Sequence, residues 1–214
     1  ILLQSEPNTL DIQNNQVVNK SDGAERMSVA EISRVVYYRG DTLPKDFQAE
    51  MMAVQHYFPK NYPFAFTNSV HCSHLEVDVN TGFIKLLKHW AVEDCGTVIN
   101  PQNVDDQVRG GVVQGIGGAL YEECIYNDQG QLLNGNLADY LVPMSAELPD
   151  IVVGHVESKT FESDLGAKGA GEAGTAGAPA AIMNALNDAL MPFDVRLTRQ
   201  PFTPQKVLEA IGKI

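Results

Sequence analysis

Residues 101–122 contain more glycine than a helix normally tolerates. Asn100 and Pro101 are typical of an N-cap followed by proline at the first helical position. Five glycines then fall within nine residues, and each costs a helix roughly 0.5–1 kcal/mol relative to alanine. Packing must offset this cost, so we expect another backbone or a bound ligand to lie closely against the helix. The expected apolar face comprises Val104, Val108, Val112, Ile116 and Leu120.

The rest of the chain alternates short strands with helices, which predicts an α+β fold with mixed and antiparallel sheets packed with helices. Hairpins are expected at 8–18 and at 75–92, the second turning at 80–82. A capping box at Ser28 predicts a helix to about Tyr38. The other expected elements are connection and edge strand at 39–62, a hairpin near 124–133, strands within 140–156, a helix to about Leu190 with Pro179 in its first turn, a strand at Val195 and Leu197, and a helix capped by Thr203.

Charge and hydropathy exclude two classes of protein. The 214 residues include 15 Lys and Arg against 27 Asp and Glu, a net charge of −12. Such an acidic balance argues against an electrostatic nucleic-acid binder, which needs a basic face. No run approaches the roughly 18 apolar residues of a membrane span, and the first residues lack the pattern of a secretion signal. The chain has no initiating Met, so we expect it to be part of a longer protein.

The three cysteines, Cys72, Cys95 and Cys124, are far apart and form no CxxC pair. This spacing argues against a zinc ribbon, a redox dithiol and an iron–sulfur cluster motif. We expect them to be partly buried small side chains in a reducing compartment, which indicates a cytoplasmic protein.

Residues 166–174 form a glycine-rich loop ahead of a predicted helix. Such a loop presents several backbone N–H groups and the positive end of the helix dipole, which suits a phosphate or another oxyanion. The sequence is neither a P-loop nor a GxGxxG motif. Glu172 would repel an anion, so it fits better as a base beside an anionic group than as its ligand. The alternative is a flexible surface loop with a solvated glutamate.

Gln114 lies within the glycine-rich helix, where its amide offers one acceptor and two donors. The surrounding glycines would let a polar ligand reach it; the alternative is an amide bonded to neighbouring backbone. In the segment 71–74, His71 and His74 would point to opposite faces of a strand, so no metal site is expected there.

Two pairs of adjacent carboxylates have an expected arrangement. Glu93 and Asp94 are adjacent in the sequence, directly after the predicted strand that ends at Val92, and cannot easily converge on one ligand. Glu122 and Glu123 lie at a helix end, where a solvated pair is expected.

Several segments resemble, in order, the C-terminal part of a known family of large subunits. They are LEVDVNTG at 75–82, VEDCGTVINP at 92–101, GGVVQGIGGAL at 110–120, DYLVP at 139–143, LPDI at 148–151 and KGAGEAG at 168–174. Together they are similar to the molybdenum-binding subunit of the xanthine dehydrogenase, aldehyde oxidase and carbon monoxide dehydrogenase family. The resemblance extends from about Asn8 to the end of the chain.

The resemblance implies roles for particular residues. Glu172 matches the active-site base of the family's Gly-x-Gly-Glu motif, and Gln114 matches a glutamine that hydrogen-bonds the molybdopterin cofactor. No residue is expected to ligate the metal. Further residues expected at the cofactor are Val70 and His71 on a strand and Lys168, Gly169, Ala170, Gly171 and Gly174 in the loop.

The resemblance also implies a function: a molybdenum hydroxylase that hydroxylates an electron-poor carbon with water-derived oxygen. The alternative is a non-catalytic domain that holds the cofactor or assembles subunits. Residues 1–214 would form the C-terminal half of the molybdopterin-binding region, as one or two subdomains.

The expected partners are the upstream half of the molybdenum subunit, iron–sulfur and flavin (FAD) subunits or domains, and a small-molecule substrate. The expected cofactor is molybdopterin with molybdenum, alone or as a dinucleotide. Without the upstream half, the chain is expected to lack the cofactor, to be inactive and to self-associate through exposed apolar surface.

Overall fold

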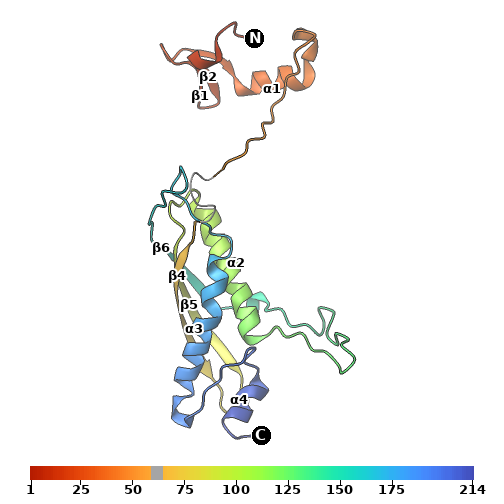
Figure 1. The fold of residues 1–214 in the computed structure, drawn as a ribbon, viewed down its shortest axis with the longest axis vertical. Coiled ribbons are helices and arrows are strands. Elements are labelled where there is room, and N and C mark those ends of the chain that lie inside the picture. The colour runs from red at the N-terminus through yellow and green to blue at the C-terminus, as the bar shows by residue number, and fades with distance from the viewer. Residues whose placement is uncertain (59–64) are drawn as a thin grey trace. The chain divides into compact units, whose positions relative to one another are not determined.

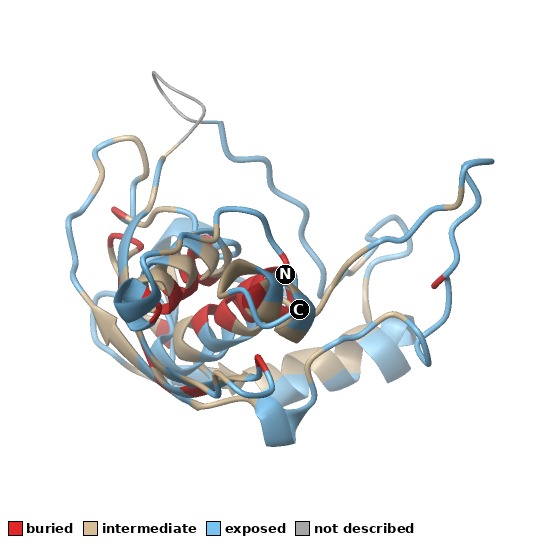
Figure 2. Ribbon diagram, turned by 90° about the horizontal axis from the view of Figure 1, so that it is seen from below, coloured by how far each residue is buried: buried red, intermediate tan, exposed pale blue. Residues whose placement is uncertain are grey.

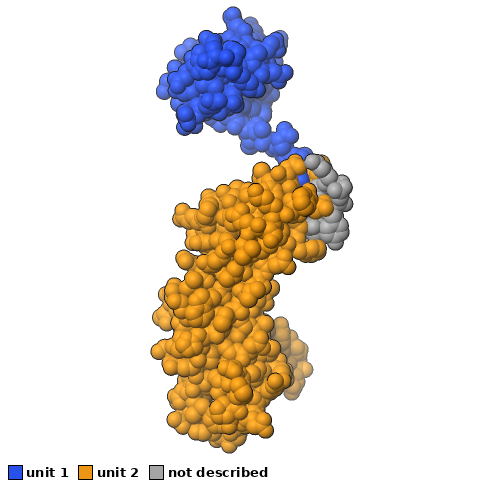
Figure 3. Space-filling view, turned by 90° about the vertical axis from the view of Figure 1, so that its left-hand side faces the viewer, with its two compact units in different colours: residues 1–57 blue, residues 58–214 orange. Residues whose placement is uncertain are grey.

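The computed structural model describes residues 1–58 and 65–214. The chain divides into two compact units, Ile1–Tyr57 and Phe58–Ile214, which are coloured separately in Figure 3. Each unit is described by itself below.

The first unit is a three-stranded antiparallel sheet followed by a helix. Strands β1 (Leu10–Gln13), β2 (Gln16–Asn19) and β3 (Glu25–Ser28) pair in sequence order. The β1–β2 turn places Asn14 and Asn15 at φ 49° and 63°, a conformation that asparagine tolerates well. Helix α1 (Val29–Tyr38) begins at the predicted capping box of Ser28 and Glu31. The predicted hairpin and helix are therefore confirmed.

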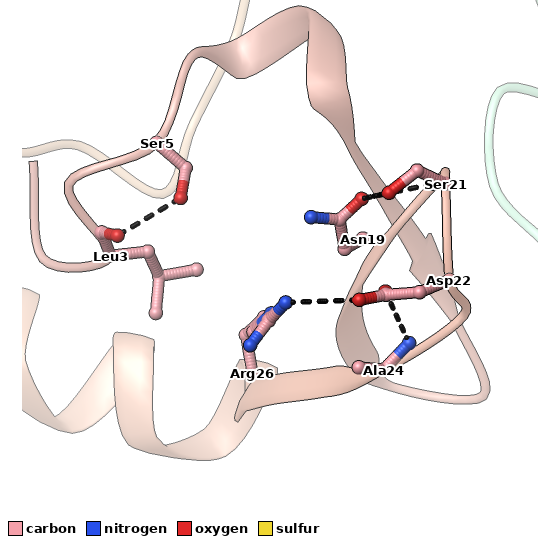
Figure 4. A network of polar contacts seen from close by, with 7 residues as sticks. All are labelled: Leu3, Ser5, Asn19, Ser21, Asp22, Ala24 and Arg26. Atoms are coloured by element: carbon pink, nitrogen blue, oxygen red, sulfur yellow. Dashed lines mark hydrogen bonds and ion pairs between the residues drawn. The ribbon is translucent and has the colours of Figure 1, made fainter.

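Polar side chains close the turn between β2 and β3 (Figure 4). Asn19 accepts hydrogen bonds from the backbone and hydroxyl of Ser21, at 2.9 and 2.8 Å. Asp22 accepts from the Ala24 amide and pairs with Arg26. The predicted edge strand does not form in 39–58, where the regular structure is a short 3-10 helix, Gly40–Thr42. Residues 59–62 of that prediction lie outside the described residues.

The second unit is built on a mixed sheet. Strands β4 (Asn68–Val77) and β5 (Ile84–Asp94) form an antiparallel hairpin, and β6 (Asp150–His155) pairs parallel to β5. The hairpin at 75–92 is confirmed, and both strands extend beyond the predicted ends. The antiparallel sheet of the first unit, this mixed sheet and the helices described next confirm the predicted α+β fold class.

Helices α2 (Pro101–Leu120) and α3 (Ala173–Ala189) lie side by side on one face of this sheet (Figure 1). The short helix α4 (Pro204–Ala210) follows, capped by Thr203 as predicted. Figure 2 shows the buried residues concentrated on the inner faces of the helices. The core includes Leu86, Ala91, Val108, Val112, Ile116, Ile151, Ile182, Leu186, Phe202 and Val207.

The glycines of α2 allow α3 to approach, as the sequence predicts. A Cβ built on Gly111 would lie 3.0 Å from the Thr175 nitrogen, and one on Gly115 would lie 2.8 Å from the Thr175 oxygen. From the other side, a Cβ on Gly174 would lie 2.2 Å from the Val108 oxygen. Glycine at these three positions therefore brings the two backbones into direct contact.

Three sequence-based expectations about the second unit need correction. Helix α3 begins at Ala173, so Pro179 lies inside the helix and not in its first turn. Because proline has no N–H, the carbonyl of Thr175, four residues earlier, receives no helical hydrogen bond, and this carbonyl faces Gly115. Residues 195–197 form no strand, because the Asn187 side chain takes both backbone groups of Leu197. Between 124 and 133 only an isolated bridge forms, at Tyr126 and Leu132.

Candidate functional site

Glu172 is exposed and stands directly before the first residue of α3. Its side chain does not cap the helix, and no hydrogen bond or ion pair of this side chain is found among the described residues. A Cβ built on Gly169 or Gly171 would meet nothing within 4 Å. The loop therefore presents a carboxylate and open backbone to solvent.

An ion pair between Asp94 and Lys168 attaches the loop to the end of strand β5. The Lys168 ammonium lies 2.9 Å from Asp94, and these side chains are only 10% and 14% exposed. Asp94 also accepts from the backbone amides of Ser158 and Gly96. The Ser158 amide and then Lys168 hold the pKa of the Asp94 carboxyl well below its usual range. The structure thus gives Lys168 a partner within the protein, and its predicted contact with a cofactor stays a prediction.

A second tether comes from α2, which sequence reasoning missed. The Gln107 amide donates to the Gly171 carbonyl at 2.7 Å, next to Glu172. Gln114 lies seven residues further along α2, which places it on the same face, about 10 Å along the axis. The seven-residue spacing of Gln107 and Gln114 was the one sequence signal that could have placed Gln107 on the same helix face.

Gln114 is exposed, and among the described residues no hydrogen bond of its side chain is found. The alternative that its amide bonds to neighbouring backbone is therefore not what the structure shows. A free amide on this face can bind a polar ligand.

The residues predicted on β4 do not share one environment. Val70 is 73% exposed on the side of the sheet away from the helices, whereas His71 is buried against α3. The Gly169 amide of the loop donates to the Ala65 carbonyl, just before the strand begins. The backbone at Ala65 therefore supplies a hydrogen bond from this segment to the loop.

A buried polar cluster around His71 was not anticipated from the sequence. Its ring nitrogens lie 3.1 Å from His89 and 3.1 Å from Glu93, and Ser73 lies 2.9 Å from the other nitrogen of His89. His89 and Glu93 are fully buried. As predicted, Glu93 does not converge with Asp94, and His71 and His74 lie on opposite faces of the strand. Cys72 and His74 are both exposed on the outer face. The described residues contain no group of three or more side chains suited to a metal ion.

Two further expectations about polar residues are wrong. Glu122 and Glu123 are half-buried: Glu122 accepts from the Tyr140 hydroxyl at 2.7 Å, and Glu123 pairs with Lys206 at 3.4 Å. The hydrogen bond to Glu122 raises the pKa of Tyr140. Of the free cysteines, Cys95 is buried, but Cys72 and Cys124 are exposed. The partners of the two glutamates, Tyr140 and Lys206, are distant in sequence, so the burial of Glu122 and Glu123 depends on the tertiary fold.

Burial of His89 predicts a pH-dependent stability. Burial and then the neighbouring His71 lower the pKa of His89 from 6.5 to about 4. Between these values the unfolded chain binds a proton that the folded chain does not, so the free energy of unfolding should fall as pH falls. We expect a loss of about 3 kcal/mol between pH 7 and pH 4, because each pH unit over which only the unfolded chain is protonated contributes about 1.4 kcal/mol.

Urea unfolding between pH 7 and pH 4 measures this effect. A His89→Gln variant should lose this component of the pH dependence, whereas His74→Gln, on the exposed face of β4, should retain it. Equal pH dependence in all three proteins would contradict the assignment.

Comparison with known proteins places these features in a family. A family profile described as a molybdopterin cofactor-binding domain matches residues 1–149. The chain is 40% identical over 188 residues to the nicotine 6-hydroxylase large subunit of Paenarthrobacter nicotinovorans, covering 86% of this chain and 22% of that protein. It is 27% identical over 210 residues to the carbon monoxide dehydrogenase large chain of Hydrogenophaga pseudoflava, covering 98% and 26%.

The fold agrees with the sequence comparison. The quinoline 2-oxidoreductase of Pseudomonas putida 86 superposes with a TM-score of 0.74 at 36% identity, covering 99% of this chain and 27% of that chain. The chain therefore belongs to the molybdopterin cofactor-binding domain family, within the molybdenum-binding subunits related to xanthine dehydrogenase and carbon monoxide dehydrogenase. It spans about a quarter of the length of these relatives. No helix among the described residues is long and apolar enough to cross a membrane.

Proposed function

We propose that this chain is part of a molybdenum hydroxylase in which Glu172 acts as the base that removes a proton from the attacking oxygen nucleophile. The observation that carries the proposal is the placement of Glu172: an exposed carboxylate, with no polar partner among the described residues, on a loop held on both sides by Lys168 and Gln107. A carboxylate that is fixed in position but free of a counter-ion is suited to general-base catalysis.

The residues of the loop and of α2 fit a molybdopterin. This cofactor is anionic and rich in hydrogen-bonding groups, and the chain offers the free amide of Gln114 and the uncrowded backbone at Gly169 and Gly171, apart from the Gly169 amide and the Gly171 carbonyl, which are already hydrogen-bonded. We extend the proposed contacts to the backbone of Lys168, Ala170 and Gly174 in the loop, and to the backbone of Val70 and His71 on the edge strand β4. The side chains of Lys168 and His71 already have partners within the protein. When bound, the cofactor supplies the two-electron acceptor and activates the oxygen that derives from water.

The chain's own residues prepare Glu172 for this role. The ion pair with Asp94 occupies Lys168, so this cation is not left to pair with Glu172 and lower its basicity. Gln107 fixes the peptide immediately before the base. Positioning of this kind matters because a catalytic group misplaced by about 1 Å can lose about 100-fold in rate.

The assembly around this chain is part of the proposal. The relatives are named as a large subunit and a large chain, which is consistent with partner subunits that carry iron–sulfur and flavin groups. The upstream half of the molybdenum subunit completes the cofactor pocket, and a small molecule is the substrate. The chain alone would lack the cofactor and self-associate; Val70 and Val92, 73% and 41% exposed on the outer sheet face, support this. Its free cysteines suit the cytoplasm.

Replacing Gln114 by alanine tests the cofactor contact. In the complete enzyme, Gln114→Ala should lower molybdenum occupancy more than it lowers turnover per bound molybdenum, because the amide binds the cofactor and takes no part in proton transfer. Elemental analysis and turnover must be measured on the same preparation, since enzyme without metal would mimic a catalytic defect.

The exposed Gln129 offers a matched control, because it lies in a turn remote in sequence from the loop. Gln129→Ala should leave both occupancy and turnover unchanged. Full occupancy in Gln114→Ala would remove this residue from the cofactor site.

A further inference from the structure

Four buried or half-buried side chains on β4 and β5 form a continuous hydrogen-bonded chain. It runs from the Ser73 hydroxyl to Nδ1 of His89, from Nε2 of His89 to Nδ1 of His71, and from Nε2 of His71 to Oε1 of Glu93. The distances are 2.9, 3.1 and 3.1 Å. We call this set the Ser73–Glu93 relay.

The chemistry of the end groups sets the direction of the relay. A carboxylate only accepts, so Nε2 of His71 must donate to Glu93. Neutral His71 then has a bare Nδ1, which accepts from Nε2 of His89. The bare Nδ1 of His89 in turn accepts from the Ser73 hydroxyl. One arrangement of protons therefore satisfies every bond without charging either histidine, and the low pKa of His89 agrees with it.

Glu93 depends on this arrangement. Its Oε2 is buried and has no hydrogen-bond partner among the described residues, so the bond from His71 is the one made by its carboxylate there. A buried carboxylate with a single bond is costly to leave unpaired. The His71 ring is thereby held strongly in one orientation.

The His71 ring lies directly against helix α3. A Cβ built on Gly177 would lie 2.2 Å from Cδ2, 2.6 Å from Cγ and 2.7 Å from Nε2 of this ring. Gly177 comes five residues after Glu172, within the second turn of the helix. The position of the ring therefore determines how closely the start of α3 can approach the sheet.

Asp94, the residue after Glu93 on β5, contacts the chain on the N-terminal side of Glu172. Because side chains alternate along a strand, Glu93 points toward the helices and Asp94 points away. Asp94 binds Lys168, four residues before Glu172, and Glu93 acts through His71 at Gly177, five residues after it. Two adjacent carboxylates on β5 thus contact the chain before and, through His71, after Glu172.

We propose that the Ser73–Glu93 relay is a positioning device: its fixed proton direction seats the His71 ring against Gly177 and so sets the position of Glu172 at the start of α3. Ser73, His89, His71 and Glu93 are positioning residues in this scheme. The catalytic part of the inference rests on the proposed function of Glu172, and the positioning part does not.

The other ionisable groups near the relay are few. On β6, His155 stands in register with Glu93 and pairs with Asp105 of α2, while its Nδ1 has no hydrogen-bond partner among the described residues. The first two turns of α3 have no ionisable side chain. The His155–Asp105 pair must therefore be monitored in any titration of the relay.

Histidine tautomers measured by NMR on the 214-residue chain test the relay directly. With ¹⁵N-labelled histidine, long-range ¹H–¹⁵N spectra distinguish protonated from bare ring nitrogens. His71 and His89 should each show one tautomer, with the proton on Nε2. A mixture of tautomers in either residue of the unmodified chain would overturn the proposal.

Substitution of Glu93 by glutamine should remove the fixed direction of hydrogen-bond donation along the Ser73–Glu93 relay. The amide can accept from or donate to His71, so both histidines should become mixtures that change together. The backbone amide signals of 173–177 should shift with them. The matched control is His74→Gln, on the exposed face of the same strand, which should change neither. Unchanged α3 signals in the presence of mixed tautomers would overturn the positioning role.

Ser73→Ala provides a milder second variant. It removes the donor to His89 but leaves the bond between His71 and Glu93, so α3 signals should shift less than in Glu93→Gln. A larger shift of the α3 signals than in Glu93→Gln would contradict the proposed order of the relay.

In the complete enzyme, a double-variant comparison separates this proposal from the proposed function. Glu93→Gln should lower kcat about tenfold or more with little change in KM or molybdenum content. In a Glu172→Gln background it should cause no further loss, because both changes act through one group. Independent losses would overturn an action through Glu172. Normal activity of Glu172→Gln would refute the proposed function, while the NMR result would still decide the positioning role.

Discussion

Replacing Glu172 by glutamine in the complete enzyme should lower turnover per molybdenum by at least about 100-fold, the lower end of the usual contribution of a general base. Glutamine keeps the size and hydrogen-bonding capacity of the side chain but cannot take the proton. Because Glu172 is exposed, the substitution should change neither the fold nor the cofactor content.

The measurement is the rate at saturating substrate, divided by molybdenum content from elemental analysis. Glu76→Gln, an exposed glutamate on the outer face of β4, controls for the removal of a surface charge and should keep its rate. Near-normal turnover in Glu172→Gln would exclude Glu172 as the base and favour a cofactor-holding or assembly domain. Loss of molybdenum with an unchanged rate per metal would instead assign the residue to cofactor binding.

Replacing Gly174 by alanine should destabilise the second unit by about 3 kcal/mol or more, at the upper end of the usual cost of overpacking. The added Cβ would lie 2.2 Å from the Val108 oxygen and 2.9 Å from the Val112 nitrogen. Both neighbours are backbone atoms of α2, so neither can rotate away. The two helices must separate, and the core between them must loosen.

Gly118→Ala is the matched control in the facing helix. A Cβ at this position meets nothing within 4 Å, so alanine should stabilise the protein by about 0.5–1 kcal/mol through its higher helix propensity. Urea unfolding of both variants measures the contrast. Equal midpoints would show that α2 and α3 are not in backbone contact at Gly174.

Features that depend on neighbours within a few residues were predictable from the sequence. The caps at Ser28, Asn100 and Thr203 all form, because each side chain bonds to an amide three residues ahead. The turn at 80–82 likewise depends on Gly82, which adopts φ 77°. These interactions require no knowledge of the rest of the fold.

Features that join separate elements were not predictable in this way. Ser73 and His89 meet only because the register of β4 and β5 places them opposite each other. Glu122 looked solvated in the sequence, yet Tyr140 reaches it from 18 residues away. Periodicity also predicted a strand at 195–197. In the structure the Asn187 side chain bonds to both the N–H and the carbonyl of Leu197, so these groups are not available to a neighbouring strand.

The sequence by itself determined that the glycine-rich helix needs a close neighbour, because the cost of its glycines follows from composition alone. Its motifs also pointed to Glu172 and Gln114 through family resemblance. Only the tertiary structure decided that the close neighbour is α3, where Gly174 meets Val108. It also decided that Asp94 and Gln107 hold the loop around Glu172. The physical reason is that composition and local spacing set what a segment requires, whereas strand register and helix packing select which distant residue satisfies it.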